Sequence, residues 1–393
     1  MEYQHPETRA TEEEKRNGWK DPYGVLFSAD RKKLIKANME LTEYRIPDGV
    51  ETICCNAFLI CRQLKSVTLP PSVRVIGEWA FNCCSSLTHI ELNEGLQTIE
   101  KNIFINCPAL KELTLPKTLA HIGHNPCPGN SLDRLTCLSP HFKVCNNMLL
   151  TADGRRLISY FGKESQVVVP QGVEEIGNVA FLDLPNLTEV SLPDSLTRIG
   201  AKAFAGCKEL NDINLPHSLI AIGDYAFQDS SISFLTLPPL LSEMGANPFK
   251  STIPFFLNSY SPHFVVRDHS LYTADGTKLI SYWHQAQKEV LPEGLQQIDH
   301  GAFGYHFHLE QIQLPSTLTT IGQEAFALCF RLQTINLPPS LQNIGHMAFT
   351  KCNAMQQIVI PPHTKEHYAE LLTNICCEEM IPKLTEHPTQ PIK

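Results

Sequence analysis

The chain has 393 residues, 42% of them hydrophobic, and a formal net charge of -9 from 41 acidic and 32 basic residues. This acidic balance, without any long lysine and arginine run, argues against a nucleic-acid partner. No stretch of 18 or more apolar residues occurs and the N-terminus lacks the apolar segment of an export signal, so we expect no membrane insertion.

The chain begins with a charged segment, residues 1–20, whose lack of hydrophobic periodicity predicts a flexible lead-in. Residues 24–36 then hold two β-prone runs around a polar turn and predict a β-hairpin. Similar hairpins, which we call cassettes, recur at residues 148–160 and 271–282, each with an Asp-Gly pair at its turn. Asp-Gly favours a tight turn because glycine tolerates positive φ, and one carboxylate per turn is too few for calcium.

Between the cassettes the sequence repeats every 23 residues. Each repeat has an Ala-Phe pair or a close relative, preceded by Leu/Ile-Pro-x-x-Leu/Val-x-x-Ile-Gly and followed by Leu-x-x-Ile/Val-x-Leu. A fixed period in the twenties predicts a solenoid, whose coils bury their apolar faces only by stacking on one another. The repeat phenylalanines are Phe58, Phe81, Phe104, Phe181, Phe204, Phe227, Phe303, Phe326 and Phe349.

One coil illustrates the expected local structure. The alternation of Leu64, Val67 and Leu69 predicts a half-buried strand, which Pro70 ends because it cannot donate to a ladder. Ile76 belongs to the inner face of a short turn, and Phe81 points inward from a further turn, expected to be a short helical or 3-10 turn. The fold predicted is a right-handed solenoid, mostly β, with a face of parallel strands.

A larger unit of about 122 residues is present three times, because the cassettes and the repeat phenylalanines recur with separations of 123 and 122 residues. We therefore predict one solenoid over residues 21–362, built of units 21–138, 139–260 and 261–362. The first two units contain an Asn-Pro pair near the end of their coils, which stops regular structure there.

The end of the chain changes to helical spacing. Tyr368, Leu371, Leu372 and Ile375 fall on one helical face. A terminal coil must be covered, so residues 363–393 are predicted to form a C-terminal capping helix and tail.

The repeat motif and the cassettes together resemble the BspA-type leucine-rich repeat family of bacteria, over residues 24–362. The resemblance implies a leucine-rich repeat solenoid and a non-enzymatic role in binding proteins or glycans, as in cell-surface and secreted adhesins. It carries no catalytic residues, cofactor or metal ligands to transfer. An intracellular protein-interaction scaffold is the alternative, because no export signal is present. We expect a monomer.

The cysteines and histidines follow the repeat rather than a chemical motif. Six of the fourteen cysteines lie three residues after a repeat phenylalanine, which favours reduced core cysteines and a reducing compartment over disulfides. His306 occupies the same position and is interpreted as a core variant, while Cys376 and Cys377 follow the C-terminal helix and favour an exposed thiol. Paired zinc ligands and nucleophile motifs do not occur, so we predict no enzyme activity and no cofactor.

The outward residues of the strands form the candidate binding face, because curved solenoids bind partners on such extended surfaces. Phe234 is unusual in a polar row: it either anchors a contact or packs beneath the neighbouring cassette. The candidate residues are His89, Glu91, Glu112, Glu189, Asp212, Asn214, Phe234, Gln311, Gln313 and Asn336.

Overall fold

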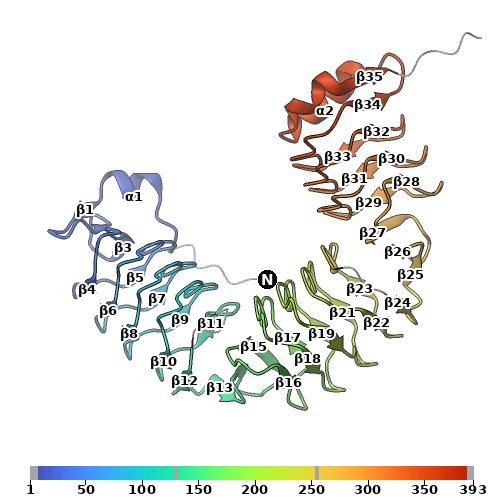
Figure 1. Ribbon diagram of the computed structural model, residues 1–393. Helices are drawn as coiled ribbons and strands as arrows, with labels where there is room; N and C mark the ends of the chain where they lie inside the picture. The colour runs from blue at the N-terminus through green and yellow to red at the C-terminus, as the bar shows by residue number, and fades with distance from the viewer. Residues whose placement is uncertain (1–7, 128–131, 253–255, 387–393) are drawn as a thin grey trace, which may run out of the picture. The chain divides into compact units, whose positions relative to one another are not determined.

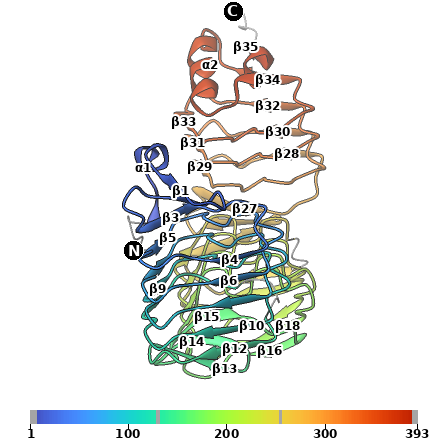
Figure 2. The same cartoon turned by 90° about the vertical axis from the view of Figure 1, so that its left-hand side faces the viewer.

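The structure, a computed structural model, describes residues 8–127, 132–252 and 256–386. The chain divides into two compact units, unit 1 (Met1–Leu187 with Ala203–Cys207) and unit 2 (Thr188–Lys202 with Lys208–Lys393). In each unit the coils stack as a parallel β-solenoid (Figures 1 and 2). Each coil contributes one strand after the cysteine position, the long-strand ladder, and one before the repeat phenylalanine, the short-strand ladder.

Unit 1 holds two sets of coils. Its long strands are β4 (Glu43–Arg45), β6 (Ser66–Thr68), β8 (His89–Glu91), β10 (Glu112–Leu115), β12 (Arg134–Cys137) and β16 (Gln166–Val168). Its short strands are β5 (Thr52–Ile53), β7 (Val75–Ile76), β9 (Thr98–Ile99), β11 (His121–Ile122) and β17 (Glu175–Ile176).

Unit 2 continues the same two strands per coil. Its long strands are β18 (Glu189–Ser191), β20 (Asp212–Ile213), β22 (Phe234–Leu237), β24 (Phe256–Ser259), β28 (Lys288–Val290), β30 (Gln311–Gln313), β32 (Thr334–Asn336) and β34 (Gln357–Ile360). Its short strands are β19 (Arg198–Ile199), β21 (Ala221–Ile222), β23 (Glu243–Met244), β29 (Gln297–Ile298), β31 (Thr320–Ile321) and β33 (Asn343–Ile344).

The short-strand ladder corrects one local prediction. Ile76, expected in a turn, lies in strand β7 and pairs with Ile53 of the preceding coil and Ile99 of the next. Two residues suffice for a strand here because the ladder is repeated coil after coil, and the isoleucines stack inward in register. The expected helical turn around Phe81 is instead a run of turns, because Trp79 and Cys83 adopt positive φ of 58° and 60°.

Most of the repeat phenylalanines have a residue with left-handed backbone, that is with positive φ, two positions before them and another two positions after them. The residues there are of many types, including Val179 at φ 54° and Ile60 at φ 65°. β-Branched residues rarely adopt this conformation. The coil geometry therefore sets the backbone at these positions whatever residue the sequence supplies.

Glycine before the Phe turn is explained by packing rather than by its φ. A Cβ on Gly77 would lie 2.6 Å from the backbone nitrogen of Cys55 in the preceding coil, and one on Gly223 would lie 2.5 Å from that of Ala201. Neither glycine has positive φ. The residue is small because neighbouring coils bring their backbones into contact there.

The core of each unit is a column of stacked aromatic rings. Phe58 and Phe81 lie 4.8 Å apart with an interplanar angle of 13°, and Phe303 and Phe326 lie 5.0 Å apart at 14°. All four are fully buried. Burial of such rings contributes about 1.5–3 kcal/mol each, so the column is a main source of stability.

The cassettes are three-stranded antiparallel sheets, one strand more than the predicted hairpin. They comprise β1 (Trp19–Lys20), β2 (Leu26–Phe27) and β3 (Lys33–Lys36); β13 (Phe142–Cys145), β14 (Met148–Thr151) and β15 (Arg156–Tyr160); and β25 (Phe264–Arg267), β26 (Ser270–Thr273) and β27 (Lys278–Tyr282). The added strand joins its neighbour through two residues of positive φ in the second and third cassettes, Asn146-Asn147 and Asp268-His269. Two successive positive φ values are typical of the type I′ hairpin turn.

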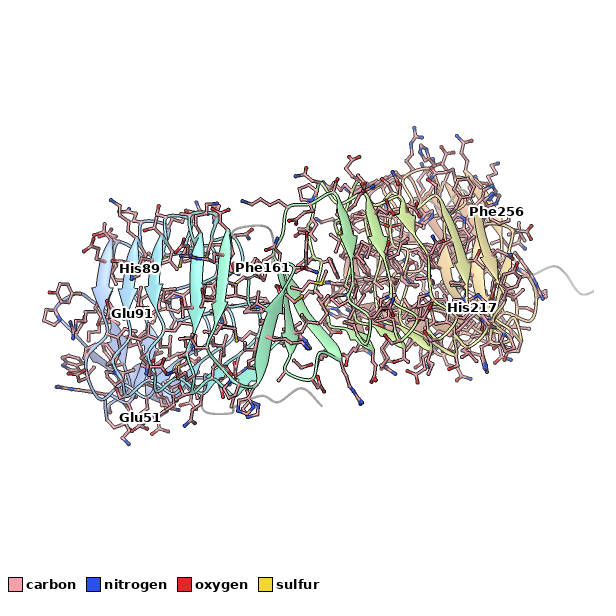
Figure 3. The ribbon with its side chains drawn as sticks, turned by 90° about the horizontal axis from the view of Figure 1, so that it is seen from below. Glu51, His89, Glu91, Phe161, His217 and Phe256 are labelled. Carbon is pink, nitrogen blue, oxygen red and sulfur yellow. The ribbon has the colours of Figure 1, made fainter. Side chains whose placement is uncertain are left out.

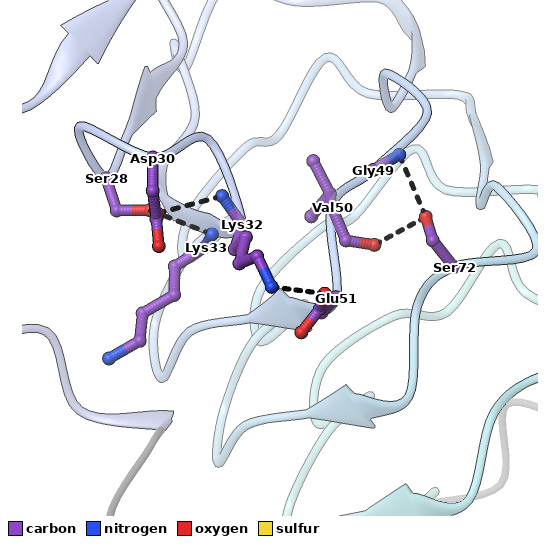
Figure 4. A network of polar contacts seen from close by, with 8 residues as sticks. All are labelled: Ser28, Asp30, Lys32, Lys33, Gly49, Val50, Glu51 and Ser72. Atoms are coloured by element: carbon purple, nitrogen blue, oxygen red, sulfur yellow. Dashed lines mark hydrogen bonds and ion pairs between the residues drawn. The ribbon is translucent and has the colours of Figure 1, made fainter.

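The aspartate of each cassette turn is a turn residue, as expected. In the first cassette Asp30 accepts hydrogen bonds from the Ser28 hydroxyl at 2.6 Å and the Lys32 backbone N–H at 3.1 Å (Figure 4). These hydrogen bonds lower the pKa of the Asp30 carboxyl. Arg31 takes the left-handed position that Gly154 and Gly276 hold in the other two cassettes.

A buried asparagine joins the end of one block of coils to the next. The amide of Asn125 donates to the Val179 carbonyl, and its oxygen accepts from the Ser159 hydroxyl, both at 2.5 Å. Asn247 repeats the arrangement with Gly301 at 2.6 Å and Ser281 at 2.5 Å. The Asn-Pro pairs therefore do more than stop regular structure: they bridge the interruption that each cassette makes.

The recurring cysteine also has a polar role. The thiols of Cys84, Cys107 and Cys329 each donate to the carbonyl of the repeat phenylalanine in the preceding coil, at 3.1 Å. All fourteen cysteines are free. Cys376 is exposed as predicted, but Cys377 is buried against the C-terminal coil, which corrects that half of the prediction.

Both ends of the described chain carry regular structure. Residues 8–20, predicted as a flexible lead-in, contain helix α1 (Glu12–Arg16) with a capping box from Thr11 and Glu14, and strand β1. Residues 1–7 lie outside the described residues. The predicted C-terminal helix is present as α2 (Lys365–Asn374), which buries Tyr368 and Leu372. A 3-10 helix, η2 (Glu378–Lys383), and a further ladder strand, β35 (Leu384–Glu386), follow it.

Candidate binding face

In unit 1 the long strands present two outward rows. Strand β8 places His89 opposite Ser66 and Glu91 opposite Thr68 of β6, and both His89 and Glu91 are exposed (Figure 3). Glu112, on β10, is exposed and forms an ion pair with Arg134 of β12 at 3.0 Å. The three unit 1 candidates are therefore accessible and polar, and exposed ion pairs of this kind contribute little to stability.

In unit 2 the candidate residues fall into two groups. Asp212 and Asn214 are exposed, and Glu189 lies directly opposite Asp212 in a parallel register. Gln311 and Gln313, on β30, are respectively half-buried and exposed.

Asn336 differs from the other candidates. Its amide donates to the Leu314 carbonyl at 2.9 Å and its oxygen accepts from the Leu314 N–H at 2.6 Å. Both ends of the amide are thus engaged with the neighbouring strand. We interpret Asn336 as a structural residue of the ladder rather than a contact residue.

Phe234 is 67% exposed, so of the two alternatives the packing beneath a cassette is wrong. It pairs in register with Phe256 of β24, which is 58% exposed (Figure 3). Tyr260, 69% exposed, follows β24 and donates its backbone N–H to the Leu237 carbonyl at 2.9 Å. The in-register pair Phe234 and Phe256 forms what we call the aromatic patch.

Sequence reasoning missed Phe256 because the candidate rows ended with the last coil of each block. The signal was available: Phe256-Leu-Asn-Ser lies 22 residues after Phe234-Leu-Thr-Leu, the same shortened step that separates Phe227 from Phe249. Two further exposed apolar residues, Val168 and Val290, lie on strands that follow a cassette, and they were missed because the candidate rows begin one coil later in each block.

The polar residues that could suggest chemistry are accounted for by packing. The His306 Nδ1–H donates to the Phe303 carbonyl at 2.9 Å, and burial lowers the pKa of the imidazole to about 4, as suits a neutral core residue. Burial raises the pKa of the Cys107 and Cys207 thiols to about 12, which keeps them protonated. Within residues 8–127, 132–252 and 256–386, no group of three potential metal-ligating side chains is found.

No helix in the described part of the chain is both long and apolar enough to cross a bilayer.

The two ladders, the Phe column and the cassettes define a solenoid repeat protein of the leucine-rich repeat class. The chain belongs to the BspA type leucine rich repeat family: the model for that repeat region, of six copies, matches residues 34–149, 159–256 and 281–382. The sequence-based assignment to this family is confirmed.

Several solved structures are similar to this chain. The pneumococcal vaccine antigen PcpA is 19% identical, with 94% of this chain and 80% of that chain covered and a TM-score of 0.48. A leucine rich cell surface protein from Faecalibacterium prausnitzii is 22% identical, with coverage of 94% and 93% and a TM-score of 0.44. A leucine-rich repeat protein from Eubacterium ventriosum is 18% identical, with coverage of 85% and 92% and a TM-score of 0.49. Among curated proteins, none matches.

Proposed function

We propose that this protein is a non-catalytic binding module that holds a protein ligand on the long-strand face of unit 2, centred on the aromatic patch. The observation that carries the proposal is the in-register pair of Phe234 and Phe256, each more than half exposed on the adjacent strands β22 and β24. Exposed aromatic residues set in a polar rim are typical of the residues that dominate protein interfaces.

The neighbouring charges indicate the kind of protein ligand. Asp212 and Glu189 occupy, on the preceding long strands, the repeat position that Phe234 holds on β22. A partner with an apolar side chain next to lysine or arginine would match this order of residues. Charges at the rim of such a contact mainly set the association rate and specificity.

The place of action follows from the family resemblance, which favours the bacterial surface and contact with host proteins or glycans. A second candidate, an intracellular protein-interaction scaffold, is supported by the fourteen unpaired cysteines, since free thiols are typical of reducing compartments. Labelling of intact cells of the producing bacterium, followed by cell fractionation, distinguishes the two candidates, because the label reaches only a surface protein.

The binding test uses the full chain, the double variant Phe234→Ser/Phe256→Ser, and Val290→Ser as a matched control with one exposed apolar residue removed from the same unit. Each is immobilised and exposed to host extracellular-matrix proteins, a glycan array and a lysate of the producing bacterium. We expect a protein ligand that the wild type and Val290→Ser retain and that the double variant binds at least tenfold more weakly.

Circular dichroism checks that all three proteins are folded. Equal binding by the double variant would place the ligand elsewhere. Retention of a glycan but of no protein would change the ligand class, and a folded wild type that retains nothing would overturn the binding role.

A further inference from the structure

The first short-strand ladder ends at β11 with two backbone acceptors exposed to a new strand. In every earlier coil these acceptors are used: the Gln97 carbonyl accepts from the Ala120 and His121 N–H groups at 2.9 and 3.0 Å, and the Ile99 carbonyl accepts from Gly123 at 2.8 Å. The equivalent acceptors on β11 are the carbonyls of Ala120 and Ile122. No N–H of the residues that the structure describes donates to either.

A groove lies along this edge of β11 within unit 1. Its volume is about 440 Å³, inside the range of about 300–1,000 Å³ typical of ligand sites. Its lining includes Ala120 and Ile122 of the ladder and Phe142, Arg156 and Ile158 of the second cassette. The groove exists because the second cassette interrupts the ladder. The next short strand, β17, follows β15 of that cassette in its sheet and does not pair with β11.

Two basic side chains that line the groove lie within ion-pair distance of a carboxylate, although the Arg156 Nε has no hydrogen-bond partner among the described residues. Lys101 lies 3.7 Å from Glu78, and Arg156 lies 3.3 Å from Glu175. A phosphate or another strongly charged ligand would have to displace these partners. The features left for recognition are the two backbone acceptors and the apolar side chains of Ile122, Ile158 and Phe142.

Two other parts of the molecule show how chain can cover such a surface. The last short strand, β33, is covered by helix α2, where the Met347 N–H donates to the Ile375 carbonyl at 3.0 Å. The Thr8 carbonyl accepts from the Cys55 N–H at 2.8 Å outside the groove, and the Thr8 hydroxyl donates at 3.1 Å to Glu100, which lines the groove. In both places a neighbouring segment of the chain forms a backbone hydrogen bond with a coil.

We propose that the groove binds an extended segment of a partner protein, which adds as a parallel strand to the edge of β11. Two of its backbone N–H groups donate to the Ala120 and Ile122 carbonyls, as strand addition requires. The site lies in unit 1 and does not depend on the aromatic patch proposed above.

The ladder geometry also predicts the preferred sequence. An isoleucine or valine of the ligand would stack on Ile122, as Ile122 stacks in register on Ile99. The next residue of the ligand would lie over Gly123. At the equivalent step within the ladder, Gly123 itself approaches the backbone of Lys101 so closely that only a residue without a Cβ fits. The ligand pattern is therefore an apolar β-branched residue followed by glycine, as in the repeats themselves.

The probe is a fluorescein-labelled peptide with the sequence of residues 73–81, Val-Arg-Val-Ile-Gly-Glu-Trp-Ala-Phe. Its matched control has sarcosine for glycine, which removes one N–H donor and leaves the side chains unchanged. Fluorescence anisotropy is measured with the full chain, with Ala120→Trp to fill the groove, and with Ile220→Trp, the same repeat position within a ladder of unit 2. Circular dichroism and the unfolding midpoint verify that both variants fold.

We expect binding of the peptide by the wild type and Ile220→Trp, and at least tenfold weaker binding for the sarcosine peptide and for Ala120→Trp. Equal binding of the two peptides, or unchanged binding by Ala120→Trp, would overturn the proposal. If the wild type binds no peptide but self-associates, and Ala120→Trp abolishes the self-association, the edge of β11 is an interface with a second copy of the chain. Binding that appears only after residues 1–7 are removed would assign it to the chain's own N-terminus. Each of these two results also refutes a partner segment.

Discussion

Replacing Asn247 tests whether the buried asparagine joins the second and third blocks of coils. Asn247 is 2% exposed, donates to the Gly301 carbonyl at 2.6 Å and accepts from the Ser281 hydroxyl at 2.5 Å. Its φ is 31°, so alanine would add backbone strain. Asn247→Gly removes both hydrogen bonds without that strain and is the cleaner variant.

The expected cost follows from the two groups left behind. The Gly301 carbonyl and the Ser281 hydroxyl would each lose a partner in a dry environment, at about 1–3 kcal/mol per group. Relaxation around the smaller residue recovers part of this, so we expect Asn247→Gly to lower the free energy of unfolding by about 2–4 kcal/mol. Asn247→Ala should cost about 1 kcal/mol more, because of the left-handed backbone.

The assay is urea unfolding followed by tryptophan fluorescence, to which the buried Trp283 contributes together with Trp19 and Trp79, and in parallel by circular dichroism. Two probes are needed because repeat proteins can unfold in parts. Ser281→Ala, which removes only one donor, should cost less than Asn247→Gly. If Asn247→Gly unfolds at the wild-type urea concentration, the asparagine does not hold the blocks together and the reasoning is refuted.

Three further predictions concern the coils. Cys329→Ser should be less destabilising than Cys329→Ala, by about 1 kcal/mol in urea unfolding, because serine keeps a donor for the Phe303 carbonyl of the preceding coil; Ser230, at the same repeat position, donates to Phe227 of its own coil at 2.8 Å. Val179→Asn should raise the unfolding midpoint by the equivalent of about 1 kcal/mol, since asparagine tolerates the φ of 54° that valine resists; a lower midpoint would contradict this. The His306 pKa is about 4 in the fold, below its ordinary 6.5, so protonation favours the unfolded chain and stability should fall by about 2–3 kcal/mol as pH drops from about 6.5 to about 4. His306→Cys should remove that dependence, and an unchanged pH profile would show that His306 is not its source.

The fold could be predicted from the sequence because the period is long, regular and repeated. Each 23-residue copy has the same pattern of apolar residues. The predictions of an inward Phe58 and of a strand around Val67 are therefore supported by many coils at once. The short strand at Ile76 could not be found by alternation, because two residues are too few to show a period. The left-handed residues were equally hidden, since valine, tryptophan and lysine give no local signal for positive φ.

The candidate face was predictable only in part. Outward positions such as His89 and Glu91 follow from strand alternation, which fixes the face of each residue. Asn336 shows the limit, because an outward amide can turn back onto its own ladder, and this depends on the backbone groups within its reach. The groove beside β11 could not be predicted, since it depends on how the second cassette departs from the ladder.

The left-handed positions around the repeat phenylalanines have a consequence for engineering this fold. Ile60, Trp79 and Met347 occupy them and are 39–41% exposed, so their side chains are not needed to fill the core. An unsuitable residue in this conformation costs about 1–2 kcal/mol. Asparagine or glycine at such sites, summed over the coils, would gain free energy comparable to the whole margin of about 5–15 kcal/mol that separates folded from unfolded domains. The chain thus holds a large reserve of thermal stability that can be recovered without altering a buried residue.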